Sequence, residues 1–214
     1  TLLNGLLYRY PELAQVPRAG IVHRLDAHTS GLMVVARTLA AQTDLVRQLQ
    51  ARTGKREYWA VAHGLAPEYR KLEAAIERDP RNPLRFRVGH GLADKPAITH
   101  LARVADCRTE ELDFSWVACR LETGRTHQIR VHLESIKLPL VGDPVYRGSR
   151  PRAAETPALW HGFARQALHA SRLGLIHPVS REGLEWFRPP PADMVALMRE
   201  FDFSPLDRPT EVFE

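Results

Sequence analysis

The chain has 214 residues, of which 44% are hydrophobic and 26% charged, with a net charge of +5 and a pI near 9.5. This is the composition of a soluble globular protein, and no apolar run approaches the roughly 18 residues that a membrane span requires. Since the first residues do not form a signal peptide and the cysteines form no CxxC pair, we expect a cytoplasmic protein with free thiols at Cys107 and Cys119.

The positive charge is compatible with a polyanionic partner, but many proteins without such a partner are mildly basic. Arginine outnumbers lysine, and its planar guanidinium binds phosphates and stacks on bases better than an ammonium group. High-GC codon usage produces the same bias. Charge alone therefore leaves nucleic-acid binding open.

The N-terminal half alternates between helical and extended patterns. Leucines at helical spacing predict a helix over residues 2–10, which a proline then ends. Residues 21–22 predict a short strand that leads into the polar stretch HRLDAHTSG, and residues 32–36 predict a second, apolar strand. A threonine cap and an apolar face predict a helix over residues 38–50, and REYWAVAHG predicts a strand over residues 56–64.

Strands dominate the next part of the sequence. The charged segment 63–96 contains many turn-forming residues and predicts short strands at most. Longer β-type runs follow at residues 97–105, 114–122, 168–178 and 184–190. Because strands and helices do not alternate strictly, the pattern predicts an α+β fold with a curved, mixed and largely antiparallel sheet flanked by helices.

Two helices remain in the C-terminal half. The segment ETGRTHQIRVHLESI has the form of a strand end, a glycine turn and a helix that Thr126 caps; its expected buried stripe consists of Ile129, Leu133 and Ile136. Residues 148–160 predict an irregular exposed loop, and residues 192–201 an amphipathic helix. Since no linker is visible, we expect residues 1–214 to form one domain.

Two polar clusters lie near predicted strand ends in the N-terminal half. In HRLD, Arg24 and Asp26 project to the same side of an extended backbone, and the simple alternative to a functional role is an exposed ion pair. In REY, Tyr58 begins a strongly apolar strand, and the simple alternative is a buried tyrosine with one hydrogen bond.

Two further clusters lie in the C-terminal half. The turn GRTHQIR leads into a helix whose free N–H groups favour anions, so Arg125 at this turn can hold a carboxylate or a phosphate. His127 and His132 do not share a helical face, which argues against a metal pair. His169 starts a predicted strand, and a structural histidine bonded to backbone is its expected role.

Taken in order, these segments resemble the RluA/RluD family of RNA pseudouridine synthases. The resemblance rests on GIVHRLDAHTSGLMVVART, KREYWAV, DKPAITH, LETGRTHQIRVHL, LPLVGDPVY and RQALHASRLGLIHP, which extend over essentially the whole chain. HRLD followed by TSGLMVVA is highly specific, and GRTHQIRVH far downstream makes coincidence implausible. The family's fold, a curved mixed sheet with a central catalytic cleft, agrees with the fold class predicted from the pattern.

The resemblance implies a role for each matching residue. Asp26 matches the catalytic aspartate, Arg24 the arginine that inserts where the target nucleotide is flipped out, and Tyr58 the tyrosine that packs against the base and can relay a proton. Arg125 matches the basic residue that pairs with the aspartate, and Ile129 the aliphatic position under the base. The neighbouring motif residues expected to contact substrate are His23, Thr126, His127, Gln128 and Arg130.

VPRAGIVHRLD and GRTHQIRVH are most similar to the RluD type, which modifies a stem-loop of 23S ribosomal RNA. The resemblance implies uridine isomerisation in this RNA by base flipping, by a monomer; the same chemistry on transfer RNA is an alternative. Full-length members usually carry an N-terminal S4-like RNA-binding domain and a lysine-proline strand, which this chain lacks; we expect a truncation, with a natural short form as the alternative. His28 stands where the family has an acidic residue.

The implied reaction explains why these residue types are needed. It breaks the N–C1′ bond, rotates the uracil and rejoins it through C5, without redox change or hydrolysis, so we expect neither cofactor nor metal. Extruding a nucleotide costs a few kcal/mol. Two rival functions remain: a metal-dependent hydrolase, which excess chelator would inhibit, and a non-catalytic RNA-binding module, which would bind RNA but isomerise none.

Overall fold

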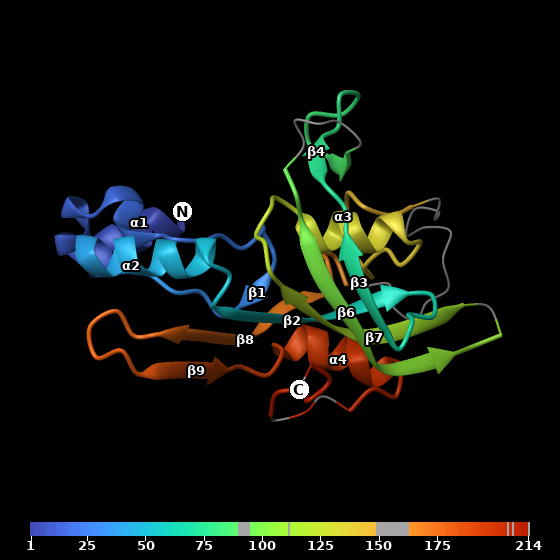
Figure 1. Cartoon of the computed structure of the whole chain (residues 1–214). Coiled ribbons are helices and arrows are strands. Elements are labelled where there is room, and N and C mark those ends of the chain that lie inside the picture. The colour runs from blue at the N-terminus through green and yellow to red at the C-terminus, as the bar shows by residue number, and fades with distance from the viewer. Residues whose placement is uncertain (90–94, 111, 149–162, 205, 207, 214) are drawn as a thin grey trace.

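The computed structural model describes residues 1–89, 95–110, 112–148, 163–204, 206 and 208–213. Its centre is a seven-stranded sheet with the order β1-β8-β2-β7-β6-β3, and β9 pairs with β8 (Figure 1). These strands are β1 (Ser30–Gly31), β2 (Lys55–His63), β3 (Tyr69–Glu73), β6 (Ile98–Arg108), β7 (Asp113–Leu121), β8 (Leu168–Ile176) and β9 (Gly183–Phe187). Among the strands of the described ranges, only β1 and β8 run parallel to each other, so the predicted mixed, largely antiparallel sheet is confirmed.

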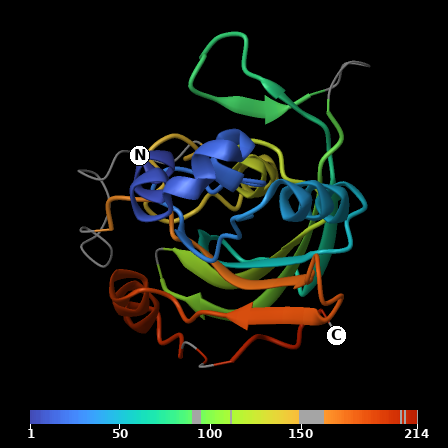
Figure 2. The same cartoon turned by 90° about the vertical axis from the view of Figure 1, so that its left-hand side faces the viewer.

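Helices lie on both faces of the sheet, as Figures 1 and 2 show. They are α1 (Leu2–Arg9), α2 (Leu39–Gln50), α3 (Gln128–Ser135) and α4 (Ala192–Glu200), and β4 (Ile76–Arg78) and β5 (Phe86–Val88) form a separate hairpin. As predicted, the Thr38 hydroxyl caps α2 by accepting a hydrogen bond from the Ala41 N–H at 3.2 Å. None of the helices in the described ranges is long and apolar enough to cross a membrane.

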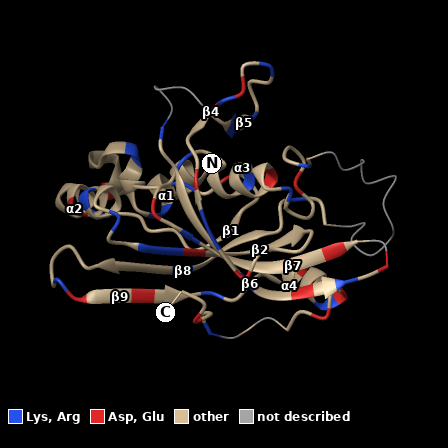
Figure 3. Cartoon of the chain, turned by 45° about the vertical axis from the view of Figure 1, so that its right-hand side comes forward, with Lys and Arg blue, Asp and Glu red and all other residues tan. Residues whose placement is uncertain are grey.

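The apolar core has one layer on each face of the sheet. Along β2, Tyr58 and Ala60 point into the layer that contains Ile129 of α3, whereas Trp59 and Val61 point into the layer of α4. This alternation follows from the two-residue repeat of a strand. It places Tyr58 on the side of the sheet that α3 covers. Lys and Arg are interspersed with Asp and Glu over the elements, so charge alone does not mark a site (Figure 3).

The strand predicted over residues 32–36 is wrong. Only Ser30–Gly31 pairs with β8, and Val35 makes a single bridge to Ile21. The backbone N–H of Val34 donates instead to the His23 ring at 3.0 Å. Since this donor is used by a side chain, no regular ladder forms here.

The predicted cap of α3 is also wrong, because the helix begins at Gln128 and its N-cap is His127 in the left-handed conformation, with φ 56° and no capping side chain. The side chain of Gln128 folds back and accepts a hydrogen bond from the Arg125 N–H at 2.9 Å. Of the predicted buried stripe, Ile129 and Leu133 are buried in α3, whereas Ile136 follows the helix as its C-cap residue and is only partly buried. The expected loop 148–160 lies outside the described residues except for Gly148.

A close approach of two backbones fixes β1. Gly31 has φ +114°, and a Cβ at this position would lie 2.2 Å from the Ala170 carbonyl oxygen. Only glycine fits here without a shift of β8. The parallel pairing of Gly31 with Ala170 therefore anchors the loop that precedes it, which contains HRLD.

Candidate active site

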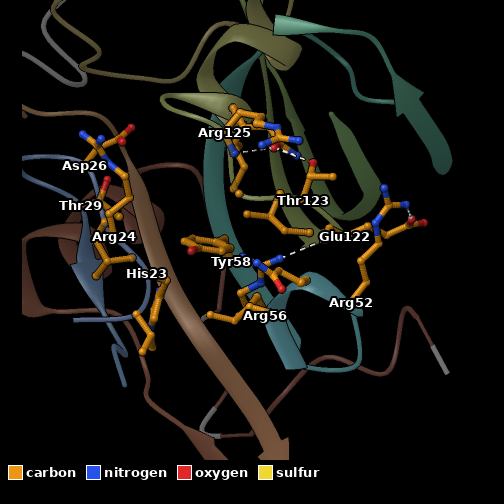
Figure 4. Close-up of a pocket in the computed structure, with 18 of the residues that line it drawn as sticks. His23, Arg24, Asp26, Thr29, Arg52, Arg56, Tyr58, Glu122, Thr123 and Arg125 are labelled. Atoms are coloured by element: carbon orange, nitrogen blue, oxygen red, sulfur yellow. Dashed lines mark hydrogen bonds and ion pairs between the residues drawn. The ribbon is translucent and has the colours of Figure 1, made fainter. Parts of the chain in front are cut away.

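A pocket of about 530 Å³ opens where this loop, the start of β2 and the turn before α3 meet (Figure 4). Seven of the ten predicted site residues line it, and the other lining side chains come from several segments, among them the end of α2, the end of β7 and the start of β8. The predicted residues are His23, Arg24, Asp26, Tyr58, Arg125, Gln128 and Ile129; the others include Arg18, Thr29, Leu49, Arg52, Arg56, Leu121, Thr123 and Leu168. The folded chain thus brings together motifs about 100 residues apart in sequence.

The loop that carries Asp26 is held from the segment before β8. The Gln166 amide donates to the carbonyl oxygen of Ala27 at 2.7 Å and to the Thr29 hydroxyl at 3.0 Å. Arg165 donates to the carbonyl oxygen of His28 at 3.1 Å. Because Gln166 is 1% exposed, these bonds are shielded from water and keep the loop in one conformation.

A buried arginine of α3 holds the side chain of Asp26. The Nη1 of Arg130 lies 3.2 Å from Oδ2 of Asp26, and its Nε and Nη2 lie 2.7 and 2.9 Å from the two oxygens of Asp143. The side-chain exposures are 5% for Arg130, 12% for Asp26 and 0% for Asp143. One guanidinium thus bridges a structural carboxylate and a carboxylate that faces the pocket.

The surroundings of Arg130 keep it charged. Burial alone would lower the pKa of its guanidinium, but hydrogen bonds and charge from Asp143 and Asp26 outweigh this effect and raise the pKa. Asp143 is fixed in turn, since its Oδ1 accepts the backbone N–H of Val145 at 2.8 Å and of Tyr146 at 2.9 Å. The arginine therefore presents a permanent positive charge in a defined position to Asp26.

The predicted ion pair between Arg125 and Asp26 is therefore wrong, and Arg130, which was expected to contact substrate, takes its place. Arg125 is exposed, and its Nε donates to the carbonyl oxygen of Pro96 at 3.0 Å. It precedes α3, whereas Arg130 lies on the buried face of the helix, and Figure 4 shows Asp26 and Arg125 on different sides of the pocket.

Gln128 and His127 hold the turn together. The Gln128 side chain is 3% exposed; it accepts from the Thr123 hydroxyl and donates to the carbonyl oxygen of Ile98. The His127 ring shares a 2.8 Å hydrogen bond with the Tyr146 hydroxyl, and burial lowers the pKa of this histidine. All the hydrogen-bonding atoms of the Gln128 amide are thus engaged within the protein, and neither His127 nor the half-buried Thr126 lines the pocket.

The two residues before Leu25 differ in their surroundings. The Nε2 of His23 accepts the Val34 N–H, and burial, with a further contribution from Arg56, lowers the pKa of this histidine to about 4. A neutral His23 therefore supports the loop. Arg24 is exposed beside the pocket and forms no ion pair with Asp26 among the described residues, so the exposed-ion-pair alternative is wrong.

Tyr58 and Ile129 form an apolar wall of the pocket. They are 7% and 4% exposed. Burial, opposed by the charge of Arg56 and reinforced by that of Asp26, raises the pKa of Tyr58 to about 12. The phenol thus stays protonated at neutral pH and offers a flat surface with one hydrogen-bond donor.

Two residues that position the site were missed in the sequence. Asp143 stands in the apolar run LPLVGDPVY, where a lone carboxylate is a signal of a buried partner. Gln166 carries no such signal. His169 has the structural role predicted for it, with hydrogen bonds to the carbonyl oxygen of Arg188 and to the Ser30 hydroxyl. No cluster of His, Cys, Asp or Glu within the described ranges is arranged to hold a metal ion.

Comparison with known proteins defines the class to which this fold and pocket belong. The family model for RNA pseudouridylate synthases matches residues 4–135, well over half of the chain. The chain belongs to the RNA pseudouridylate synthase family. The solved structure of human RNA pseudouridylate synthase domain containing 1 superposes with a TM-score of 0.69 at 28% identity, over 96% of this chain and 79% of that one.

Among curated proteins, the chain is similar to ribosomal large subunit pseudouridine synthase D. The Neisseria meningitidis serogroup B protein is 53% identical over 200 residues, which cover 92% of this chain and 52% of that protein. The Escherichia coli K12 protein of the same name is 49% identical over 203 residues, which cover 92% of this chain and 60% of its own length. The chain thus spans about half the length of the Neisseria relative.

Proposed function

We propose that the chain isomerises uridine to pseudouridine in structured RNA, with large-subunit (23S) ribosomal RNA as its substrate and Asp26 as the catalytic carboxylate. The observation that carries the proposal is the position of Asp26, which lines the pocket and is held by the buried guanidinium of Arg130. The chain that contains this pocket belongs to the RNA pseudouridylate synthase family. The substrate is proposed from relatives named ribosomal large subunit pseudouridine synthase D.

The reaction requires the target nucleotide to leave its helix, because stacking hides both C1′ and the faces of the base. Arg24 is exposed at the pocket, two residues before Asp26 in sequence. Its planar guanidinium with five donors suits the space that the extruded nucleotide leaves and can bond to the orphaned base. Arg24 thus offsets part of the cost of extrusion.

Asp26 then acts on the extruded uridine in the pocket. The carboxylate attacks the sugar, attacks the base or abstracts a sugar proton, and each route requires its ionised form. The role of Arg130 is to hold this carboxylate in position at the pocket through the 3.2 Å ion pair. Tyr58 and Ile129 supply the apolar wall against which the uracil packs, and Tyr58 donates a hydrogen bond without ionising.

Arg125 has a different role from the one expected. Because it is exposed at the rim of the pocket and has no carboxylate partner among the described residues, it is suited to a phosphate of the RNA backbone. We further propose that the protein acts as a monomer in the cytoplasm.

The test is the Asp26→Asn variant, which keeps the shape of the side chain and removes its charge. Pseudouridine formation in large-subunit ribosomal RNA, mapped by carbodiimide-stop sequencing, should fall by about 10³-fold or more, whereas RNA affinity should change only a few-fold. A variant with appreciable turnover contradicts the mechanism. A wild-type chain that binds RNA but forms no pseudouridine, either alone or within its full-length parent, contradicts the proposed activity and favours a binding module.

A further inference from the structure

Arg56 is a buried arginine that lines the pocket, and nothing in the proposed mechanism uses it. It lies on β2 two residues before Tyr58, so both side chains project from the same face of the strand. Arg56 is 7% exposed and lines the pocket, and its guanidinium lies beside the Tyr58 ring (Figure 4).

Unlike Arg130, Arg56 has no counterion. Its Nη2 donates to the Glu122 carbonyl oxygen at 3.1 Å, while its Nε is buried without a hydrogen-bond partner. No carboxylate in the described part of the chain forms an ion pair with it. An unpaired buried cation is costly, and burial accordingly lowers the pKa of this guanidinium. The burial of this unpaired cation is therefore explained better by the binding of a ligand than by a contribution to the stability of the fold.

The neighbouring turn leaves room for this guanidinium. A Cβ built on Gly124 would lie 2.9 Å from Nη1 of Arg56. Any larger residue at position 124 would displace the guanidinium, so the glycine that opens GRTHQIR also shapes the pocket around Arg56. The cation is thus held in place by a backbone carbonyl on one side and a glycine on another, with its remaining donors free for a ligand.

We propose that Arg56 binds the uracil of the extruded uridine and stabilises the negative charge that this base carries during the reaction. The inference rests on the proposed function. When the N1–C1′ bond breaks, its electron pair stays on the uracil and is shared by N1, O2, C5 and O4. C5 then bonds to C1′ and loses its proton to solvent, while N1 takes up a proton. If Asp26 instead adds to C6 of the base, the displaced pair moves to C5 and O4. A negative uracil arises on either route.

The position of Arg56 favours the base over a phosphate. Arg56 is buried beside Tyr58, the wall for the base, whereas Arg24 and Arg125 are exposed at the pocket, where an RNA backbone can reach them. A donor directed at charge that develops only during the reaction accelerates the chemical step more than it strengthens binding.

The experiment compares wild type with Arg56→Met, Arg56→Lys and Arg181→Met. Arg181 is an exposed arginine paired with Asp44, and its variant is a control for the loss of one positive charge. The probe is transcribed large-subunit ribosomal RNA that contains 5-[³H]uridine, which releases tritium when C5 loses its hydrogen. Single-turnover rates are measured at saturating enzyme, and RNA dissociation constants and melting temperatures are measured separately.

For Arg56→Met we expect a rate that is lower by about 10²–10³-fold, as for the loss of one anion-stabilising donor, with a dissociation constant within about threefold of wild type. Its melting temperature should equal or exceed that of wild type, because an unpaired buried cation is removed. Arg56→Lys, which keeps the charge but loses the planar fork of donors, should be about tenfold faster than Arg56→Met and still clearly slower than wild type. Arg181→Met should match wild type.

Three results would overturn the assignment of Arg56. The first is a near wild-type rate for Arg56→Met. The second is a larger RNA dissociation constant with an unchanged rate at saturating enzyme, which indicates a phosphate contact. The third is a large fall in melting temperature, which indicates a structural role. If Arg56→Met does not fold, a wild-type rate for Arg56→Lys overturns it as well. An inactive wild-type enzyme would refute the proposed function itself, and the inference with it.

Discussion

Replacing Arg130 by methionine tests the central ion pair most directly. The change removes the guanidinium that contacts Asp26 at 3.2 Å and both oxygens of Asp143. Asp143 has a side chain with 0% exposure, so water cannot replace the lost partner. Breaking a buried ion pair by removing one member costs about 3–5 kcal/mol. For a chain of this length each kcal/mol lowers the melting temperature by roughly 2–4 °C, so we expect a fall on the order of 10 °C.

The matched control is Arg125→Met, in the turn that precedes α3. Arg125 is exposed and makes one side-chain hydrogen bond, to the carbonyl oxygen of Pro96, so its removal should cost at most about 0.5 kcal/mol. Both variants lose one positive charge from the same region, so their difference isolates the contribution of the ion pair. Thermal unfolding followed by circular dichroism measures both.

Turnover should separate the two variants as well. Without Arg130 the Asp26 carboxylate loses its cation, and we expect pseudouridine formation to fall by at least about 10²-fold at temperatures where the variant is folded. A double-mutant cycle between residues 26 and 130 should show a coupling of about 1 kcal/mol or more in stability. The reasoning is refuted if Arg125→Met is the more damaging variant, or if Arg130→Met unfolds and turns over like wild type.

Two further predictions concern the loop that carries Asp26. The pKa of His23 in the folded chain, about 4, lies below the usual 6.5, so the stability that neutral His23 contributes is complete above pH 6.5 and is lost as the pH falls toward 4. This loss amounts to about 3 kcal/mol at most. In denaturation curves recorded across this pH range, His23→Gln should therefore show a smaller fall in stability than wild type. Gly31→Ala should destabilise the chain by about 1–3 kcal/mol and slow turnover, because the new Cβ would meet the Ala170 carbonyl oxygen. Gly183→Ala is the control, since open space surrounds Gly183, and it should change neither stability nor turnover. Equal melting temperatures for the two variants would contradict this prediction.

Much of the fold was predictable because its elements have strong local signals. The helix at residues 39–50 has a threonine cap and an apolar face, and β2 is a long β-branched and aromatic run. The sequence of the segment 32–36 also resembles a strand, but its pairing depends on the hydrogen-bond partners that its backbone finds in the folded chain. The His23 ring accepts one of its N–H groups, and no local pattern reveals such a contact.

The site was predictable as a set of segments but not as a set of contacts. The motifs place Asp26, Tyr58 and Ile129 in one pocket, as expected. The choice between two arginines five residues apart depends on where α3 starts and on which of its faces packs inward. The helix starts one residue later than predicted, so Arg125 lies in the turn before it, whereas Arg130 lies on its buried face.

The residues that hold the Asp26 loop in place also set the minimum length of an active fragment. The family model ends at residue 135, and a fragment cut there would keep Asp26, Tyr58 and Arg130. It would lose Asp143, the Gln166 amide that grips the loop and the β8 backbone against which Gly31 rests. Such a fragment would contain every signature residue of the reaction, yet we expect it to be inert, since the acid is put in place by partners that are synthesised after it.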